Sequence, residues 1–381
     1  MSQIHNHNIF GQLRTELNRT FPERRNVIEG SLAAVLAQEH VLMLGPPGTA
    51  KSALVRTIAS AFSGVYFERL LTKFSTPEEL FGPISLRALE QDRFARVVTG
   101  KLPEAEFCFL DEVFKSNSAI LNSLLTLMNE RLFHNDGAPI RTPLVSMFGA
   151  SNELPEGREL EALFDRFMVR FDMQYILRPS NLRTMLLMPE PATTVRIGMS
   201  DLRAAQAGAR AVTVTDDTVE ALINIREGLR QEGFSISDRR LKKSLGLVRA
   251  VAFMADQPQT SPEDLLCLVD SLWREPKERT KVQQIVGKVA DPVSIQAQEV
   301  LDAALELSQR IEQARQQDRK TFIGLAAQSL DMFAQQQSKL LELSKQAGRR
   351  ASALLSDVSQ EIDGLKTEYA RAVSIGLGLK R

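Results

Sequence analysis

The stretch VLMLGPPGTAKSALVRTIASAF, residues 41–62, constrains the fold more than any other part of this sequence. Its apolar run stops at a bend of two glycines and two prolines, and apolar residues return at helical spacing after Lys51 and Ser52. A strand, a tight loop and a helix in this order bring several backbone N–H groups together at the positive end of the helix dipole. The stretch therefore predicts a phosphate-binding loop at the start of a helix.

The loop agrees with the pattern G-x-x-x-x-G-K-[ST], except that Ala50 stands where the pattern has its last glycine. In such a loop Lys51 reaches the β- and γ-phosphates of a nucleotide, and Ser52 ligates Mg²⁺. Alanine tolerates a right-handed φ, so we expect the loop to survive the replacement if Ala50 is not left-handed. The predicted nucleotide-binding residues are Gly45, Pro46, Pro47, Gly48, Thr49, Ala50, Lys51 and Ser52.

Polar side chains end two further apolar strands. The stretch FCFLDE ends in Asp111 and Glu112, and FGASNE places Asn152 after another strand. Beside a phosphate loop, Asp111 can hold Mg²⁺ through water, and Glu112 can orient and polarise the attacking water. Asn152 can position this water and sense the γ-phosphate. The alternative for Asn152 by itself is an ordinary turn asparagine.

Two arginines in LEALFDRFMVRF are candidates for stabilising the charge on a transferred phosphoryl group. These are Arg166 and Arg170, and such an arginine can come from a neighbouring subunit. The alternative is a surface arginine that pairs with Asp165 or Glu161.

A second pair of arginines, Arg239 and Arg240, lies at a predicted helix start in SISDRRLKK. The helix dipole disfavours a cation at this end, so a nearby anion would explain the pair. Simple solvation is the alternative.

The order of predicted elements indicates an α/β core followed by helices. Apolar strands spaced by helices favour a parallel sheet covered on both faces, and they are expected at residues 41–44, 65–71, 106–110, 144–150 and 167–171. Residues 81–103 and 131–143 read as insertions, and the second has the Asn-Asp-Gly turn of a hairpin.

From residue 178 the pattern is helical. Helices are expected at residues 181–187, 216–231, 238–255 and 262–272. No proline follows Pro292, and the apolar spacing there predicts a helical hairpin or a three-helix bundle. We therefore predict a nucleotide-binding core over residues 1–177, a helical lid over 178–276 and a helical C-terminal part over 277–381.

Composition narrows the class of protein. The 381 residues carry 47 Lys+Arg and 47 Asp+Glu, so their net charge of zero gives no general attraction to nucleic acid or to an acidic membrane. No run approaches the roughly 18–20 apolar residues of a membrane helix, and no signal-peptide core is present. Only Cys108 and Cys267 are present, which suits a reducing compartment. We expect a cytoplasmic protein without membrane insertion.

The motifs together resemble those of the MoxR family of AAA+ ATPases, most closely its RavA-type branch. The resemblance covers residues 42–243 and is carried by LGPPGTAKS, FSTPEELFGPISLRAL, GKLPEAEFCFLDEVFK, AILNSLLTLMNER, ASNELPE, LEALFDRFMVR and SDRRLKK. It implies a P-loop AAA+ α/β core with a helical lid domain, here followed by an all-helical C-terminal extension. It also implies Mg²⁺-dependent hydrolysis of ATP, and alanine before the P-loop lysine is usual in that family.

The resemblance implies a role for each matching residue. Lys51 and Ser52 match the P-loop lysine and the Mg²⁺-linked serine, and Asp111 and Glu112 match the acidic pair with Glu112 as catalytic base. The remaining matches are Asn152 to the γ-phosphate sensor, Arg166 to the arginine finger acting on the adjacent subunit, and Arg239, with Arg240 as the alternative, to the second sensor of the lid.

The family also implies partners. Its members form hexamers with a chaperone-like role toward protein clients, and their partners often carry a von Willebrand factor A domain. The two insertions match segments that face the channel of the ring. One departure concerns residues 292–381, which read as helices only, whereas RavA-type proteins carry a β-rich module there.

Two other classes of function remain open. A nucleic-acid motor is favoured by the basic cluster of Lys339, Lys345, Arg349 and Arg350, but the zero net charge and the few aromatic residues disfavour it. A nucleotide-gated scaffold would instead recruit partners through the C-terminal helices, with hydrolysis timing their release.

Overall fold

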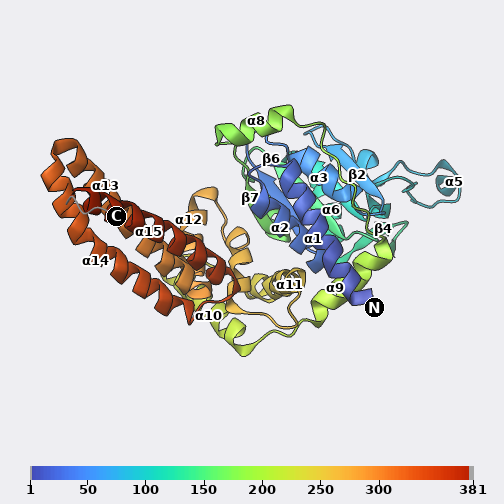
Figure 1. The fold of residues 1–381 in the computed structure, drawn as a ribbon. Helices are drawn as coiled ribbons and strands as arrows, with labels where there is room; N and C mark the ends of the chain where they lie inside the picture. The colour runs from blue at the N-terminus through green and yellow to red at the C-terminus, as the bar shows by residue number, and fades with distance from the viewer. Residues whose placement is uncertain (1, 377–381) are drawn as a thin grey trace. The chain divides into compact units, whose positions relative to one another are not determined.

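The computed structural model describes residues 2–376 (Figure 1). The chain forms two compact units, Met1–Glu220 with Leu229–Val282, and Ala221–Gly228 with Gln283–Arg381. This division follows compactness alone, and it assigns the helices after residue 177 to both units. The three-domain division remains a prediction.

A five-stranded parallel sheet forms the centre of the first unit, as the sequence predicts. Its strand order is β2-β3-β6-β1-β7. Four of the strands are almost wholly buried, which explains their continuous apolar sequences. The strands are β1 (His40–Leu44), β2 (Tyr66–Leu70), β3 (Phe107–Asp111), β6 (Ser146–Ser151) and β7 (Phe167–Asp172).

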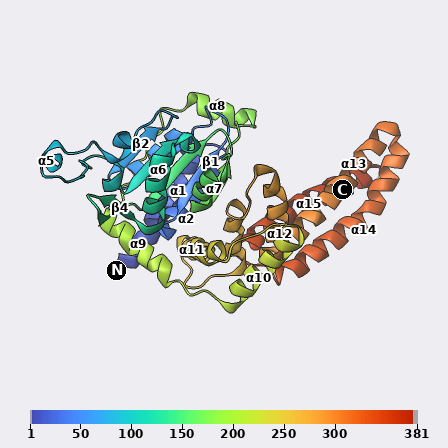
Figure 2. The same cartoon turned by 180° about the vertical axis from the view of Figure 1, so that it is seen from behind.

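Helices cover both faces of the sheet (Figure 1 and Figure 2). Helices α2 and α11 pack on β7, whereas α6 and α7 pack on each other. Right-handed crossovers place α6 and α7 on the face opposite to α3. The helices of this layer arrangement are α1 (Ser2–Thr20), α2 (Arg25–Ala37), α3 (Lys51–Ser60), α6 (Ser118–Glu130), α7 (Arg158–Arg166), α9 (Met199–Ala211) and α11 (Asp238–Met254).

The register of the strands defines two opposite edges of the sheet. His40 at the start of β1 lies opposite Phe167 at the start of β7, and Leu44 lies opposite Ser151 and Asp172. We call these ends the amino edge and the carboxyl edge. At about 3.3 Å per residue, a five-residue strand separates the two edges by more than about 13 Å.

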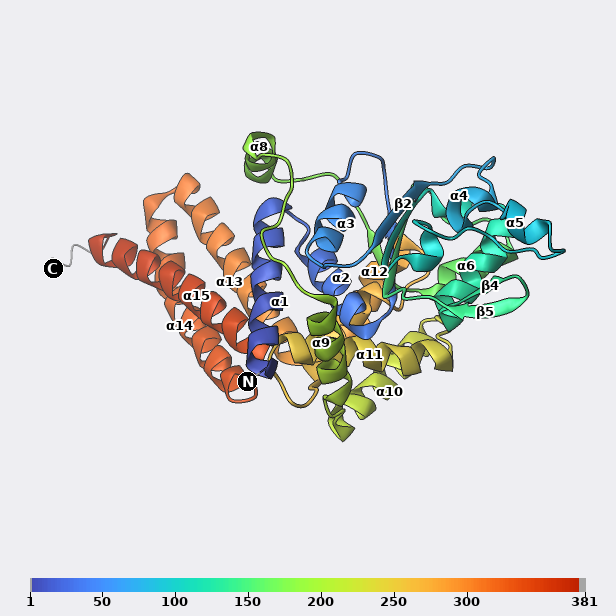
Figure 3. The same cartoon turned by 90° about the vertical axis from the view of Figure 1, so that its right-hand side faces the viewer.

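The two predicted insertions are joined to each other. The Asn135 side chain accepts from the Arg96 N–H (2.6 Å) and donates to the Arg96 carbonyl (3.1 Å), and Arg93 pairs with Asp136 (2.7 Å). Figure 3 shows these segments gathered beside α6. They consist of the predicted hairpin, β4 (Leu132–Asn135) with β5 (Ala138–Arg141), and of α4 (Pro77–Phe81), α5 (Leu86–Leu89) and η1 (Leu102–Glu104).

Shorter helices complete the connections. The predicted helix at residues 262–272 is a 3₁₀ helix, and α9 and α12 have no counterpart in the sequence prediction. Ser237 caps α11 by accepting from the Arg240 N–H. The remaining elements are η2 (Val113–Lys115), α8 (Pro179–Leu187), α10 (Asp216–Gln231), η3 (Pro262–Asp270), η4 (Pro276–Glu278) and α12 (Arg279–Ala290).

The second unit is built around a three-helix bundle, one of the two arrangements that the apolar spacing predicts. In its core, the rings of Phe333 and Tyr369 stack with centroids 5.9 Å apart. Within residues 292–376 the structure contains helices and no strand. The bundle consists of α13 (Pro292–Gln317), α14 (Arg319–Ser344) and α15 (Arg349–Gly376).

Across both units, no described helix is long and apolar enough to cross a membrane.

Candidate active site

The predicted phosphate loop joins β1 to α3 at the carboxyl edge. Gly45 has a φ of 137°, and a Cβ there would lie 2.2 Å from the Met173 carbonyl oxygen. Only glycine therefore allows the loop to leave the sheet so close to the chain that follows β7. Gly48 is also left-handed, with a φ of 78°. Left-handed residues in a short loop turn successive N–H groups to one side, which forms a concave anion site.

The sequence analysis expected the loop to tolerate alanine only if Ala50 is not left-handed, and this expectation is wrong. Its φ is 66° and its ψ is 23°, so the residue is left-handed. An alanine in this conformation costs about 1–2 kcal/mol because its Cβ approaches the following carbonyl oxygen. Residues held in such conformations are typical of ligand-binding sites.

Lys51, the first residue of α3, has its ammonium group inside the loop. It donates to the carbonyl oxygens of Gly45 (2.6 Å) and Pro46 (3.0 Å) and to Asn152 Oδ1 (3.3 Å). Burial lowers the pKa of Lys51, while the negative charges of Asp111 and Glu112 act in the opposite direction. The side chain is therefore a buried cation at the start of a helix.

Glu112 and Asn152 complete a chain of polar contacts with Lys51. Asn152 Nδ2 donates to Glu112 Oε1 at 2.6 Å, and Lys51 contacts the other side of the same amide. Glu112 has a left-handed φ of 54°, an uncommon conformation for this residue type, and its N–H donates to Asp111 Oδ1 (3.0 Å). The structure thus brings together Lys51, Asp111, Glu112 and Asn152 from three neighbouring strand ends.

These residues fit ATP and Mg²⁺. In the described chain no side chain caps the N-terminus of α3, so its first N–H groups are directed at the loop, together with the Lys51 ammonium. Ser52 lies half-buried in the first turn of α3, and Asp111 ends the neighbouring strand β3. A hydroxyl and a carboxylate are oxygen donors of the kind that Mg²⁺ prefers. When bound, the metal would neutralise charge on the phosphate oxygens.

Arg166 lies at the amino edge of the sheet, at the end of α7 and directly before β7. Its Nη1 donates to the Ala162 carbonyl oxygen at 3.1 Å, and its buried Nε makes no hydrogen bond to any described residue. Burial lowers the pKa of Arg166, and the charge of Arg239 lowers it further. The alternative pairing with Asp165 is found for Arg170 (3.8 Å), which is buried, while Arg240 and not Arg166 makes the other contact with Asp165 (3.3 Å).

Arg170 and Arg240 are both engaged inside the protein. Arg170 donates to the Trp273 carbonyl oxygen (2.6 Å) and lies over the ring of Phe164, with 3.9 Å from its guanidinium carbon to the centroid. Arg240 is 6% exposed and donates to four backbone carbonyl oxygens, those of Asp165, Phe167, Met168 and Ser271. Asp165 is the anion that the helix-start argument required.

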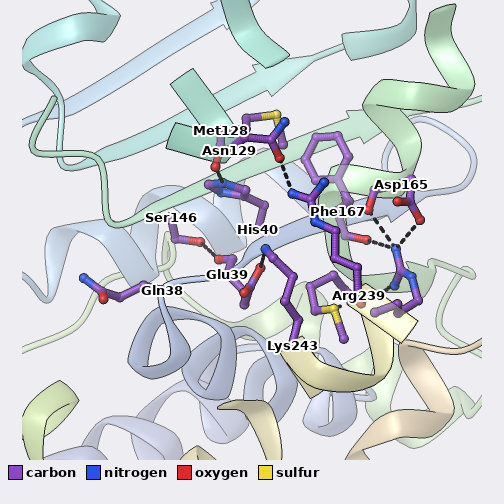
Figure 4. Close-up of polar contacts among 12 residues, drawn as sticks. Gln38, Glu39, His40, Met128, Asn129, Ser146, Asp165, Phe167, Arg239 and Lys243 are labelled. Atoms are coloured by element: carbon purple, nitrogen blue, oxygen red, sulfur yellow. Dashed lines mark hydrogen bonds and ion pairs between the residues drawn. The ribbon is translucent and has the colours of Figure 1, made fainter. Parts of the chain in front are cut away.

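Arg239 is exposed and lies with Arg166. Its guanidinium donates to Asn129 Oδ1 at 2.7 Å, and its charge acts on Arg166. Lys243, one turn further along α11, pairs with Glu39 at 2.7 Å (Figure 4). Arg166, Arg239 and Lys243 line one small hollow. The sequence interpretation did not single out Lys243, although its spacing from Arg239 on a helix could have suggested it.

The geometry separates the predicted site residues into two groups. Lys51, Asp111, Glu112 and Asn152 lie at the carboxyl edge, and Arg166 lies at the amino edge with Arg239. A strand length lies between the groups, which exceeds the reach of an arginine side chain. Arg166 therefore does not approach the phosphate loop of its own chain.

Comparisons with known proteins show which families the chain resembles. Residues 9–194 match the family model described as the MoxR domain in the MoxR-vWA-beta-propeller ternary systems, and residues 217–286 match the AAA lid domain model. The uncharacterized protein MJ0812 of Methanocaldococcus jannaschii is 38% identical over 368 residues, which cover 93% of this chain and 97% of the relative. The chaperone MoxR1 of Mycobacterium tuberculosis is 27% identical over 164 residues, 42% of this chain and 43% of that one.

A solved structure supports the fold. The crystal structure of a Cytophaga hutchinsonii protein assigned as an ATPase superposes with a TM-score of 0.62 at 19% identity. The match covers 76% of this chain and 95% of that chain.

Proposed function

Because the chain belongs to the MoxR family of AAA+ ATPases, we propose that it forms a ring and couples Mg²⁺-dependent ATP hydrolysis to the remodelling or maturation of a client protein. The observation that carries this proposal is the continuous contact from Lys51 through Asn152 to Glu112 beside the phosphate loop. Phosphoryl transfer uses a lysine at the phosphates and a polar or acidic group that orients the nucleophile, and this contact places both kinds of group together.

The chemistry assigns one task to each residue. Lys51 and the loop N–H groups would hold the phosphates, and Ser52 and Asp111 would hold the metal. Asn152 fixes the carboxylate of Glu112, which orients a water molecule and accepts its proton as the water oxygen bonds to the γ-phosphorus. The bond from this phosphorus to the β-phosphate oxygen breaks, and the products are ADP and inorganic phosphate.

The charge that develops on the γ-phosphate requires a further cation, which we assign to Arg166 of a neighbouring copy. Arg239 shares the hollow with Arg166, so we assign it to the same task from the same copy. One edge of each copy then meets the opposite edge of the next. Such a head-to-tail contact closes into a ring when its rotation permits, and we propose a hexamer.

The joined insertions are our candidate for the surface that contacts the client. Leu86 and Phe94 are exposed there, and the hydrogen bonds between Asn135 and Arg96 hold the two segments together. Exposed apolar side chains on a projecting segment suit the apolar stretches of an unfolded or partly folded protein. A partner with a von Willebrand factor A domain is proposed from the description of the matching family model.

The finer assignments are also proposals. We place the chain near the RavA-type branch on its motifs, and in the cytoplasm because its two cysteines form no disulfide. Docking that depends on the β-rich module of that branch is not transferred, because residues 292–376 contain only helices.

The test compares the wild type with Glu112→Gln, and Lys51→Ala serves as the control that cannot hold phosphate. We expect Glu112→Gln to bind ATP in calorimetry and to hydrolyse it about 10²–10⁴-fold more slowly, because it lacks the base. It should also retain client protein that Lys51→Ala does not retain. Absence of ATP binding by the wild type in the presence of Mg²⁺ would refute the ATPase assignment, and equal recovery of clients with both variants would refute the chaperone-like role.

A further inference from the structure

Helix α8 presents an unusual surface for a folded chain. All nine of its residues, Pro179–Leu187, are incompletely buried. Leu186 is 70% and Leu187 is 75% exposed, and Leu177 just before the helix is 82% exposed. Figure 1 and Figure 3 show α8 at the outside of the core, away from the helices that cover the sheet. We call Leu177, Leu182, Met185, Leu186 and Leu187 the α8 patch.

A helix of this length is not stable in water by itself, since most helical stability comes from the packing of an apolar face. The start of α8 is held by Glu23, whose carboxylate accepts from the N–H groups of Leu177 (2.8 Å) and Arg178 (2.9 Å) and from the Asn181 amide (2.9 Å). Tyr175 Oη also donates to the carbonyl oxygen of Pro47 in the phosphate loop, at 3.2 Å. The helix is thus anchored beside the nucleotide site while its apolar side chains face solvent.

A groove runs along α7 on the same unit. It has a volume of ≈ 510 Å³. Past Phe164 and Ile236 it continues into a second hollow that reaches Asp165 and Arg240, next to Arg166. The apolar residues of the groove are Leu154, Pro155, Phe164, Phe234, Ile236 and Leu272.

The charges of the helix and the groove are complementary. Residues 179–187 contain Arg183 and no acidic residue, and Arg178 precedes them. The groove is lined by three carboxylates, Glu161, Glu275 and Glu278, and by one guanidinium, that of Arg274. A basic apolar helix therefore fits an acidic apolar groove.

We propose that α8 of one copy of this chain occupies the α7 groove of the next copy. The inference rests on the proposed function, because α8 borders the phosphate loop and the groove leads to Arg166. Docking would bring the arginine-bearing side of one copy against the nucleotide side of its neighbour. The contact uses two different surfaces, so it is head-to-tail and propagates around a ring.

The first experiment uses Leu186→Glu, with Leu341→Glu as a matched control on an exposed leucine of α14. We expect Leu186→Glu to weaken self-association at least about tenfold in analytical ultracentrifugation with ATP and Mg²⁺. The variant should still bind ATP as one chain. The control should assemble as the wild type does. Unchanged assembly of Leu186→Glu would overturn the docking, whereas loss of ATP binding by the wild type would overturn the proposed function.

The second experiment identifies the occupant by disulfide formation in a Cys267→Ser background, in which the remaining Cys108 is buried. Leu186→Cys and Phe234→Cys are prepared as separate chains. We expect a cross-linked dimer only when the two are mixed. A dimer from Leu186→Cys alone would indicate helix-to-helix contact, and an internal disulfide in a chain carrying both changes would indicate that α8 fills its own groove. Either result would overturn the proposal.

The third experiment exchanges charges between the two surfaces. Arg183→Glu should weaken assembly, and Glu161→Arg in the partner chain should restore it. We expect each variant alone to assemble poorly. Recovery in the mixture would then indicate a direct contact, because misfolded chains would not recover assembly on mixing. Failure to restore assembly would contradict a pairing of these two surfaces.

Discussion

The two edges of the sheet carry opposite chemistry. The carboxyl edge gathers Asp111 and Glu112 with an amide and one enclosed lysine. The amino edge gathers Arg166, Arg239 and Lys243 in one hollow, together with the internally engaged Arg240.

If the proposed function holds, the difference between the edges means that one copy carries two halves of different sites. In open α/β sheets, ligands bind outside the carboxyl ends of the strands, where loops and helix N-termini converge. The amino edge has no phosphate loop within the described residues, but it holds the cations that a phosphoryl transfer needs. Two copies in head-to-tail contact would join one half from each.

The largest expected effect is the loss of turnover in Arg166→Ala, and mixing this variant with one that lacks the catalytic carboxylate tests its cause. Arg166→Ala should lower turnover about 10³-fold or more while leaving ATP binding nearly intact, because an arginine finger contributes about this much. In an equal mixture with Glu112→Gln, about one interface in four joins an intact carboxyl edge to an intact amino edge. We therefore expect about a quarter of wild-type turnover from two nearly inactive variants. A mixture that stays inactive, or an Arg166→Ala monomer with normal turnover, would place Arg166 in a different role.

Two neighbouring residues of the amino edge should behave differently. Arg240→Ala removes a buried guanidinium that donates to four carbonyl oxygens, of which the Met168 oxygen keeps the Ser271 hydroxyl as a donor, so we expect a loss of about 3 kcal/mol in the free energy of unfolding. Arg239→Ala removes an exposed side chain, and we expect unchanged stability with turnover lowered about 10–100-fold. Urea unfolding and ATPase assays separate the two effects. Equal destabilisation by both changes would contradict a structural role for Arg240 alone.

The buried His40 makes the amino edge sensitive to acid. Its Nδ1 accepts from the Met147 N–H at 2.9 Å, and its Nε2 lies 3.1 Å from the Met128 carbonyl oxygen. Burial, and then the charge of Arg131, holds the pKa of His40 well below its ordinary value. Below about pH 6.5 the His40 imidazole binds a proton in the unfolded chain but stays neutral in the folded chain. The free energy of unfolding therefore decreases as the pH falls, by up to about 1.4 kcal/mol per pH unit.

Urea unfolding between pH 7 and pH 5 measures this slope. The His40→Gln variant lacks the imidazole. As the pH falls, the free energy of unfolding should therefore decrease more steeply in the wild type than in the variant, by a difference in slope that corresponds to up to one bound proton. Parallel curves for the two proteins would contradict a neutral buried imidazole.

The smallest effect concerns the strained alanine at the carboxyl edge. Ala50→Gly relieves the left-handed conformation, but glycine also gains freedom in the unfolded chain. We expect a net stabilisation of up to about 1 kcal/mol, measured by thermal unfolding. A destabilised variant would show that the methyl group of Ala50 makes a packing contact that outweighs the strain.

Much of the carboxyl edge could be predicted because its residues are local in the sequence. The apolar strands, the glycines of the loop and the acids at a strand end each lie in one short segment. A parallel sheet then places all the strand ends together, so Lys51, Glu112 and Asn152 meet without any further information. The handedness of Ala50 escaped the prediction because the surrounding loop, and not the alanine, sets its φ.

The sequence alone determined the parallel sheet and predicted the phosphate loop and the acids, because each depends on a local pattern of apolar and polar residues. Only the tertiary structure decided which arginine is available. Arg239 and Arg240 are adjacent in sequence, yet one is exposed beside Arg166 and the other is buried against four carbonyl oxygens. Side chains one residue apart on a helix point about 100° apart, so long-range packing decides which of them faces the protein and which faces a partner.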